Sequence, residues 1–310
     1  MLSYLAQRLL ESFFVLAIMS LVIYLLIGLM PGDPIDIMIF SDPEMTPAEA
    51  ERLRAIYGLD QPILDRYLAW LGNALSGDFG YSRLYNQPTL DILLPRLGNT
   101  VILMGLSFIL ALVIALPAGI YAATRPQSPV DHAINMLAFA GISVPPFWLA
   151  ILLIILFAVT LGWLPAGGWN GGSLESMLLP VITLALPQVA VIARLMRGSM
   201  IEALRSDHVR TARAYGLPVR MIVITHSLRA ASLPAISYLG PAAAALLTGS
   251  VVVETIFGLP GIGRYFVQGA LNRDYTLVMG TVIIVALFVI VFNLIVDLLY
   301  AALDPRVRYD

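Results

Sequence analysis

The chain has 310 residues, of which 59% are hydrophobic and 12% are charged, and its mean hydropathy is +0.86. These values lie far outside the range of soluble globular domains and indicate an integral membrane protein. All 18 basic residues are arginine and cysteine is absent, which excludes a lysine-dependent ATP-binding loop, a Schiff base, a thiol nucleophile, a thiolate metal site and a disulfide.

Apolar stretches predict an all-α membrane protein with about six transmembrane helices, because a hydrocarbon core takes about 20 helical residues to cross. The first stretch ends at residues 30–33 without a small-residue cleavage site, so we expect a retained anchor. The fourth carries Pro180 and Pro187, which free carbonyl groups and therefore need neighbouring helices or a wet pathway. The six predicted spans are Ser12 to Met30, Val101 to Ala123, Ile134 to Leu161, Met177 to Ala193, Ala230 to Val253 and Tyr275 to Val296.

Arginine in the short loops predicts the orientation, because positive residues accumulate in cytoplasmic loops. Only Arg264 and Arg273 fall on one side, and the other short-loop arginines fall with both chain ends on the opposite side. Both termini are therefore expected in the cytoplasm. The chain then divides into an N-terminal anchor (1–30), an external loop or cap (31–99) and a five-helix core (100–310).

Two helices are predicted in the external loop. Thr46 is a capping residue with Pro47 at the first helical position and acids in the first turn, and the helix should end near residues 57–58. The second helix, Ile63 to Leu75, should share one apolar face among Leu64, Tyr67, Leu68 and Leu71. Packing on the membrane-embedded body and use as a docking surface both remain open for these helices.

An arginine-rich stretch, residues 194–229, lies between two uncharged apolar runs. Ser206 and Asp207 can cap a short helix there, and Gly216 followed by Pro218 marks its end. We expect Val209, Ala212 and Tyr215 on one flank and two arginines on another.

A helix this short is not stable alone in water, so the following segment (219–228) or the groove of a partner must hold it. The alternative is an ordinary positive loop whose arginines meet anionic lipid headgroups.

Isolated polar residues give weaker signals. His132, His208 and His226 are dispersed without paired ligand spacing, so no metal is expected. Glu254 and Asp297 lie near span ends, where a capping or interhelical hydrogen bond is favoured over a substrate or gating role.

Short strings spread through the chain carry a family resemblance. They are Pro31-Gly32-Asp33-Pro34, Tyr57-Gly58-Leu59-Asp60-Gln61-Pro62, Gly77-Asp78-Phe79-Gly80-Tyr81-Ser82, Ser143-Val144-Pro145-Pro146-Phe147-Trp148, Arg210 to Gly216 with Pro234, Val253 to Gly263, Arg273-Asp274-Tyr275 and Asp304-Pro305-Arg306. With these strings in register from end to end, the sequence resembles the integral membrane subunits of binding-protein-dependent ABC importers, specifically the dipeptide/oligopeptide permease family.

The resemblance implies a type I-like permease fold with a cytoplasmic coupling helix, the so-called EAA loop, which sits in a cleft of a separate ATPase subunit. Arginine replaces the usual glutamate, and the spacing from Gly216 to Pro234 is longer than in most importers; both departures are typical of the peptide branch. The residues that would couple to the ATPase are Arg210, Thr211, Ala212, Arg213, Tyr215 and Gly216.

The same resemblance implies the partners and the localisation. These are two ABC ATPase subunits that bind ATP and Mg²⁺ in place of this chain, a second homologous permease, an external solute-binding protein and the bacterial inner membrane. No catalytic, cofactor-binding or metal-binding residue and no nucleic acid are expected. The run from Glu254 to Gly263 would lie near the docked binding protein, and its proposed outer-gate residues are Glu254, Gly258, Pro260, Gly261 and Gly263.

Peptide is the expected substrate, although family members also carry nickel complexes, glutathione or sugars. Two other function classes compete. A secondary transporter would show ionisable residues deep in the spans or a repeat between halves, and neither is evident. An intramembrane hydrolase needs a Ser/His pair or converging carboxylates, and no predicted span contains histidine.

Overall fold

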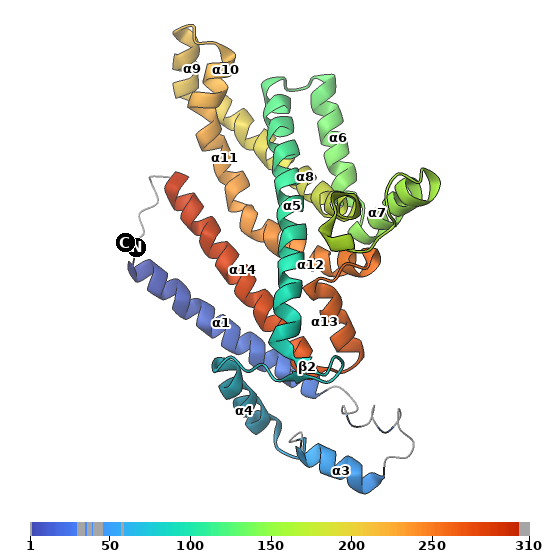
Figure 1. The fold of residues 1–310 in the computed structure, drawn as a ribbon. Helices are drawn as coiled ribbons and strands as arrows, with labels where there is room; N and C mark the ends of the chain where they lie inside the picture. The colour runs from blue at the N-terminus through green and yellow to red at the C-terminus, as the bar shows by residue number, and fades with distance from the viewer. Residues whose placement is uncertain (1, 30–34, 36–38, 40–45, 57–58, 304–310) are drawn as a thin grey trace. The chain divides into compact units, whose positions relative to one another are not determined.

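The computed structural model describes residues 2–29, 35, 39, 46–56 and 59–303. Within these ranges the chain is mostly helical, as expected, and five helices are long and apolar enough to cross a membrane, or six if one bent pair counts as a span (Figure 1). The predicted helix end at residues 57–58 and the strings at 31–34 and 304–306 lie outside the described residues.

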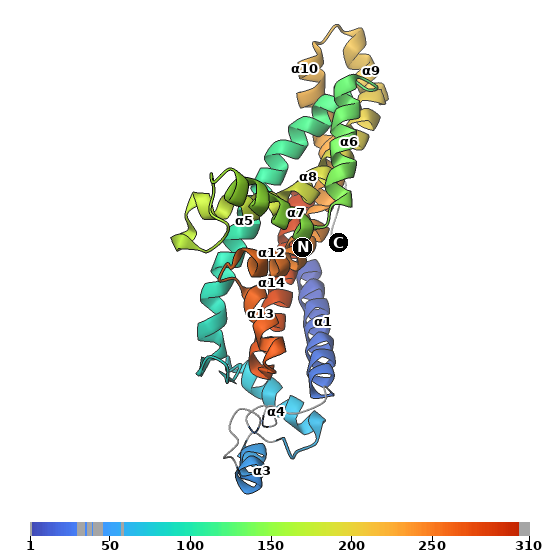
Figure 2. The same cartoon turned by 90° about the vertical axis from the view of Figure 1, so that its right-hand side faces the viewer.

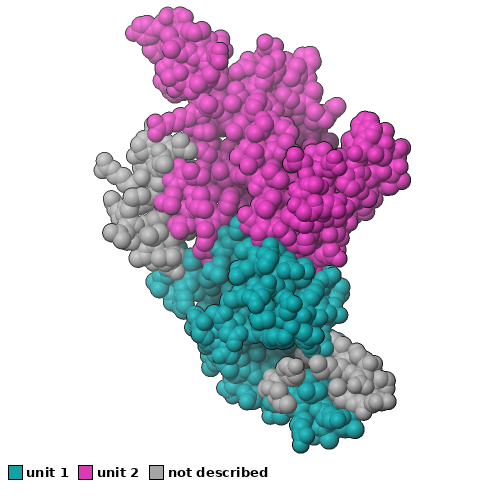
Figure 3. Space-filling view, viewed as in Figure 1, with its two compact units in different colours: residues 1–97, 265–288, 310 teal, residues 98–264, 289–309 magenta. Residues whose placement is uncertain are grey.

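The chain forms two compact units (Figure 3). Unit 1 comprises residues 1–97, 265–288 and 310, and unit 2 comprises residues 98–264 and 289–309. The helices that cross unit boundaries are α5 (Thr89–Thr124), α13 (Ile262–Leu271) and α14 (Tyr275–Leu303). The other elements are α1 (Leu2–Gly28), α3 (Pro47–Ile56), α4 (Ile63–Leu75), β1 (Tyr81–Ser82) and β2 (Gln87–Pro88) in unit 1, and α6 (Pro129–Ser143), α7 (Pro146–Leu153), η1 (Ile154–Thr160), η2 (Asn170–Gly172), α8 (Leu174–Arg205), α9 (Asp207–Ala214), α10 (Val219–Met221), η3 (Ile222–Ser227), α11 (Leu228–Ser237) and α12 (Leu239–Phe257) in unit 2.

In unit 1, α3 begins as the sequence predicts. The backbone N–H and the hydroxyl of Thr46 both donate to the Glu49 carboxylate, at 2.9 and 2.8 Å, and Glu49 N–H donates back to the Thr46 hydroxyl at 3.3 Å. This reciprocal capping box satisfies N–H groups that the first turn leaves without helical partners.

The second helix of this segment, α4, packs on α1, and only part of the apolar face predicted for it is buried. Tyr67 is buried against α1, where its hydroxyl lies 2.9 Å from the Ser20 hydroxyl. Leu64 and Leu68 are instead 55% and 62% exposed. Tyr67 lies at the edge of the leucine stripe, so rotating α4 to bury tyrosine on α1 turns the leucines outward.

The third predicted span is not one helix, because α6 and the segment Pro146–Thr160 are bent by 103° relative to each other. Val144 is extended (φ −89°, ψ 118°) and precedes Pro145 and Pro146. Proline disfavours helical geometry in the residue before it and donates no backbone hydrogen bond, so the helix must end there.

The fourth predicted span is longer than expected, since α8 runs from Leu174 to Arg205 with Pro180 and Pro187 inside it. It contacts α6, α7, α11 and α12, and Pro180 is buried while Pro187 is half-buried. The fifth is divided at Tyr238 into α11 and α12, and Pro241 falls in the first turn of α12, where its missing N–H costs nothing.

Candidate functional site

Helix α9 connects the end of α8 to α10 and contains eight residues. Its predicted side-chain cap is absent, because the Ser206 hydroxyl donates to the Ala203 carbonyl at 2.6 Å and so closes α8 instead. The negative charge of Asp207 in the first turn interacts favourably with the positive end of the helix dipole. Gly216 has φ +77° and terminates the helix as predicted, in a conformation that glycine adopts at low cost.

The following segment holds α9 in place. Val209 and Ala212 are buried against Ile222 in one apolar cluster. His208 Nε2 lies 3.1 Å from the carbonyl oxygen of His226, which adds a polar contact to the same segment. Of the two predicted ways to stabilise this helix, the structure therefore shows the intramolecular one.

The opposite side of α9 faces outward. We call the exposed residues Arg210, Thr211, Arg213, Tyr215 and Gly216 the α9 face. Tyr215 was expected beside the buried pair, but the helix ends at Ala214 and the tyrosine side chain is 82% exposed. The α9 face thus carries two guanidinium groups and an aromatic ring, whereas Ala212 belongs to the buried anchor.

The charges of the α9 face are available to a partner. Arg210 lies 3.2 Å from Asp207, and their side chains are 78% and 94% exposed, so solvent screens this pair and it contributes little to stability. Helices α9 and α10 lie together at one end of unit 2, beyond the last turn of α8 and the first turn of α11, in both ribbon views (Figures 1 and 2). The geometry suits protein contact rather than chemistry on a small molecule.

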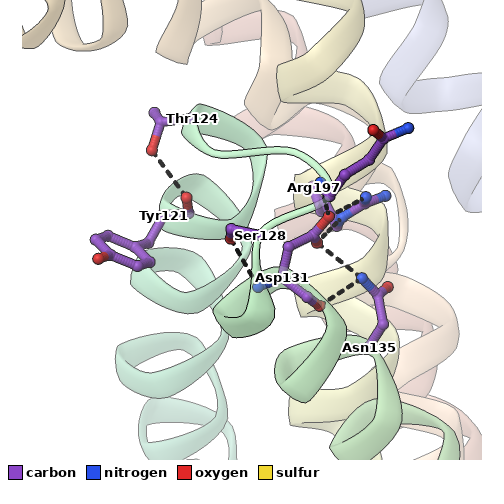
Figure 4. A network of polar contacts seen from close by, with 7 residues as sticks. Tyr121, Thr124, Ser128, Asp131, Asn135 and Arg197 are labelled. Carbon is purple, nitrogen blue, oxygen red and sulfur yellow. Dashed lines mark hydrogen bonds and ion pairs between the residues drawn. The ribbon is translucent and has the colours of Figure 1, made fainter.

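A polar network fixes the helices that lead to α9 (Figure 4). The Asp131 carboxylate accepts hydrogen bonds from Arg197 Nε at 2.5 Å and Nη2 at 2.7 Å, from Gln127 N–H at 2.9 Å and from Asn135 Nδ2 at 2.8 Å. The aspartate side chain is 2% exposed and the arginine 26%. This bidentate pair ties the start of α6 to α8.

A second polar contact ties α8 to α11, where the Ser199 hydroxyl donates to the Ala231 carbonyl at 2.7 Å. Sequence analysis did not single out Asp131, Arg197 or Ser199. The sequence does show that Asp131 lies in the first turn of a helix that begins with Ser128 and Pro129. It gives no signal for the partner of Asp131, Arg197, which is 66 residues away.

The predicted outer-gate residues converge on one turn between α12 and α13. Gly258 has φ +67° and ends α12, and the Glu254 carboxylate is fully buried beneath the turn. It accepts hydrogen bonds from the N–H groups of Gly263 at 2.8 Å and Arg264 at 3.2 Å, and from the Thr100 hydroxyl at 2.6 Å. Glu254 thereby caps α13, which fits the hydrogen-bonding interpretation favoured from sequence.

The glycines of this turn leave room for that carboxylate. A Cβ added at Gly261 would overlap the Glu254 carboxylate, and one added at Gly263 would lie 2.6 Å from Val251 Cα. The Pro260 carbonyl accepts a hydrogen bond from Asn99 Nδ2 at 2.9 Å. The turn is therefore held on several sides, and its gating role stays a prediction.

Across residues 2–29, 46–56 and 59–303, no cluster of His, Asp and Glu could hold a metal ion.

Comparisons with known proteins cover the whole chain. Residues 115–309 match the family model described as "Binding-protein-dependent transport system inner membrane component", and residues 1–104 match the model of its N-terminal part. The chain is 43% identical over 311 residues to the oligopeptide transport system permease protein OppB of Salmonella typhimurium, and 39% identical over 318 residues to AppB of Bacillus subtilis. In both alignments 100% of each chain is covered.

Proposed function

Because the chain belongs to the family of binding-protein-dependent transport system inner membrane components, we propose that it is the oligopeptide-translocating permease subunit of an ABC importer. The full-length identity of 43% to an oligopeptide permease carries this proposal. The chain is a multi-pass inner membrane subunit without catalytic chemistry of its own. Peptide is supported over a nickel complex, glutathione or a sugar, because the similar permeases are named for oligopeptides.

The α9 face would form the contact with an ATPase subunit. Its buried side is already occupied by the chain's own residues, and its outer side presents Arg210, Arg213 and Tyr215 to a partner. Arginine and tyrosine are enriched among residues that dominate protein interfaces. ATP and Mg²⁺ would bind to two such ATPase subunits, while both termini of this chain and α9 lie in the cytoplasm.

The remaining partners follow from the same assignment. A second, homologous permease would complete the translocation pathway at their interface, and an external solute-binding protein would deliver the peptide. Movement of α9 driven by the ATPases would reach the spans through α8 and α11, which Ser199 and Ala231 connect.

The test is uptake of a labelled oligopeptide into proteoliposomes that contain the complete complex. Arg213→Glu should lower the coupling of ATP hydrolysis to uptake at least about tenfold, which corresponds to about 1.4 kcal/mol. Gly216→Pro should uncouple as well, because φ +77° is closed to proline. Arg52→Glu on α3 is the matched control and should retain coupling.

Three results would contradict the proposal or part of it. Wild-type coupling in both the Arg213 and Gly216 variants would remove the role of the α9 face. Uptake by the chain alone, without ATP and ATPase subunits, would identify a secondary transporter. A complex that imports nickel or glutathione but no oligopeptide would refute the substrate assignment while leaving the importer architecture intact.

A further inference from the structure

A cavity of about 460 Å³ lies within unit 1, where the last turn of α1 meets the beginning of α14. Tyr24 of α1, Trp70 of α4 and Tyr275 of α14 are among its walls. The volume falls in the range of small-ligand sites, roughly 300 to 1,000 Å³. The importer function proposed above does not use this cavity.

The cavity has an excess of positive charge. Its described lining residues include the three arginines Arg66, Arg83 and Arg273 and one carboxylate, that of Asp274. Arg83 Nη2 donates to the Asn272 carbonyl at 2.7 Å. In the part of the chain that the structure describes, the guanidinium groups of Arg66 and Arg273 make no hydrogen bond or ion pair.

The carboxylate of Asp274 is already engaged by its own neighbours. It is buried and accepts hydrogen bonds from the Ser82 hydroxyl at 2.6 Å and from the N–H groups of Leu84 at 3.0 Å and Leu277 at 3.1 Å. These contacts fold the β1 region onto the start of α14. Asp274 therefore serves the fold and leaves the arginine charges to another anion.

The aromatic walls add a second, independent observation. The indole N–H of Trp70 is buried and has no hydrogen-bond partner among the described residues. Its ring lies 6.0 Å from that of Tyr24 and 6.3 Å from that of Tyr67, measured between centroids. A buried donor without an acceptor costs free energy, so an acceptor in the cavity would stabilise this arrangement.

The position of the cavity selects the kind of anion. It lies at the ends of two segments long and apolar enough to span a membrane, Leu10–Gly28 and Tyr275–Leu299. Tyrosine and tryptophan at such ends occupy the headgroup layer, where phosphates are concentrated. On the outer side of α4, Leu64, Leu68 and Leu75 are exposed beside α1, as in a helix that lies at a lipid interface.

We propose that this cavity binds the phosphate of an anionic phospholipid headgroup. Arg66 and Arg273 supply charge-assisted hydrogen bonds to phosphate oxygens, and the Trp70 indole N–H supplies one more. Apolar lining residues Leu59 and Met279 contact the glycerol portion. The bound lipid braces α4 against α1 and α14.

The experiment measures binding of phosphatidylglycerol to the purified full-length chain in detergent by native mass spectrometry, with phosphatidylcholine as the neutral comparison. We expect preferential phosphatidylglycerol binding that weakens at least about tenfold in the Arg66→Gln/Arg273→Gln double variant. Trp70→Phe keeps an aromatic, though smaller, ring at this position and removes the indole N–H, so it should weaken binding. Arg52→Gln, an exposed arginine outside the cavity, is the matched control.

Several outcomes would overturn the proposal. These are equal binding of the two lipids, unchanged phosphatidylglycerol affinity in the double variant and in Trp70→Phe, or an equal loss in Arg52→Gln. Competition by inorganic phosphate at the same concentration as the lipid would assign the cavity to a free anion instead. None of these results depends on ATP or peptide uptake, so failure here leaves the proposed importer function untouched.

Discussion

The cap that Glu254 forms on α13 is a measurable contribution to stability. Glu254→Ala would leave the N–H groups of Gly263 and Arg264 without their acceptor and remove a partner of the Thr100 hydroxyl. Each buried group left unsatisfied costs about 1 to 3 kcal/mol, and removing a buried charge returns part of that cost. We expect a net loss of about 3 kcal/mol.

Glu254→Gln separates hydrogen bonding from charge. The amide oxygen can still accept from the two backbone N–H groups, and the amide nitrogen can donate to the Thr100 hydroxyl, which is 2.6 Å from the carboxylate in the wild type. The charge assistance is lost and the hydroxyl proton of Thr100 loses its acceptor, so a loss of about 1 kcal/mol is expected. Thr255→Ala changes an exposed neighbour on the same helix and should cost less than about 0.5 kcal/mol.

Thermal unfolding of the purified chain in detergent provides the assay. With roughly 2 °C per kcal/mol for a chain of this size, the alanine variant should lower Tm by about 6 °C and the glutamine variant by about 2 °C. Equal Tm values for alanine and wild type would refute the capping role. A glutamine variant with near-normal Tm but no peptide uptake would instead support a gating function that requires the charge.

Three further changes test other parts of the structure. Gly261→Val should lower Tm and assembly as well as uptake, because the added Cβ overlaps a buried carboxylate. Normal assembly measured by co-purification would contradict this. Asp131→Asn should destabilise by about 2 to 3 kcal/mol through loss of the bidentate bond to Arg197, and an unchanged Tm would argue against it. Hydrogen bonds from Thr46 lower the pKa of Glu49. The resulting stabilisation of α3 should therefore be present above the ordinary glutamate pKa and disappear as the pH falls through the lowered pKa. Amide hydrogen exchange in α3 should show this loss, and Glu49→Gln should abolish its pH dependence.

Local chemistry made several features predictable from the sequence. The start of α3 at Thr46 and the end of α9 at Gly216 each depend on residues only a few positions apart. Helix spans were found because apolar length alone identifies them. The bend at Pro145 was missed by hydropathy, although two consecutive prolines were a visible signal for it.

Long-range partners could not be predicted in the same way. In the sequence, Arg197 contributes only to the positive charge that predicts orientation. Its ion pair with Asp131 forms because α6 packs on α8, which the sequence alone does not show. The exposure of Tyr215 follows from a helix that ends one residue earlier than its spacing suggested. Helix boundaries are the least certain part of such predictions, and a single residue moves a side chain to another face.

Helix α8 connects the features on which the coupling proposal depends. Its contacts with α6 through Arg197 and with α11 through Ser199 lie near its C-terminal end, so they connect these three helices close to α9. Pro180 and Pro187 lie well before those contacts, and each removes one helical hydrogen bond. Bending of α8 is therefore easiest at the prolines, between the part held by polar contacts and the rest of the span. If the α9 face binds an ATPase subunit as proposed, a force on it would rotate the connected ends of α6, α8 and α11 together. The bend of α8 at Pro180 and Pro187 would then change.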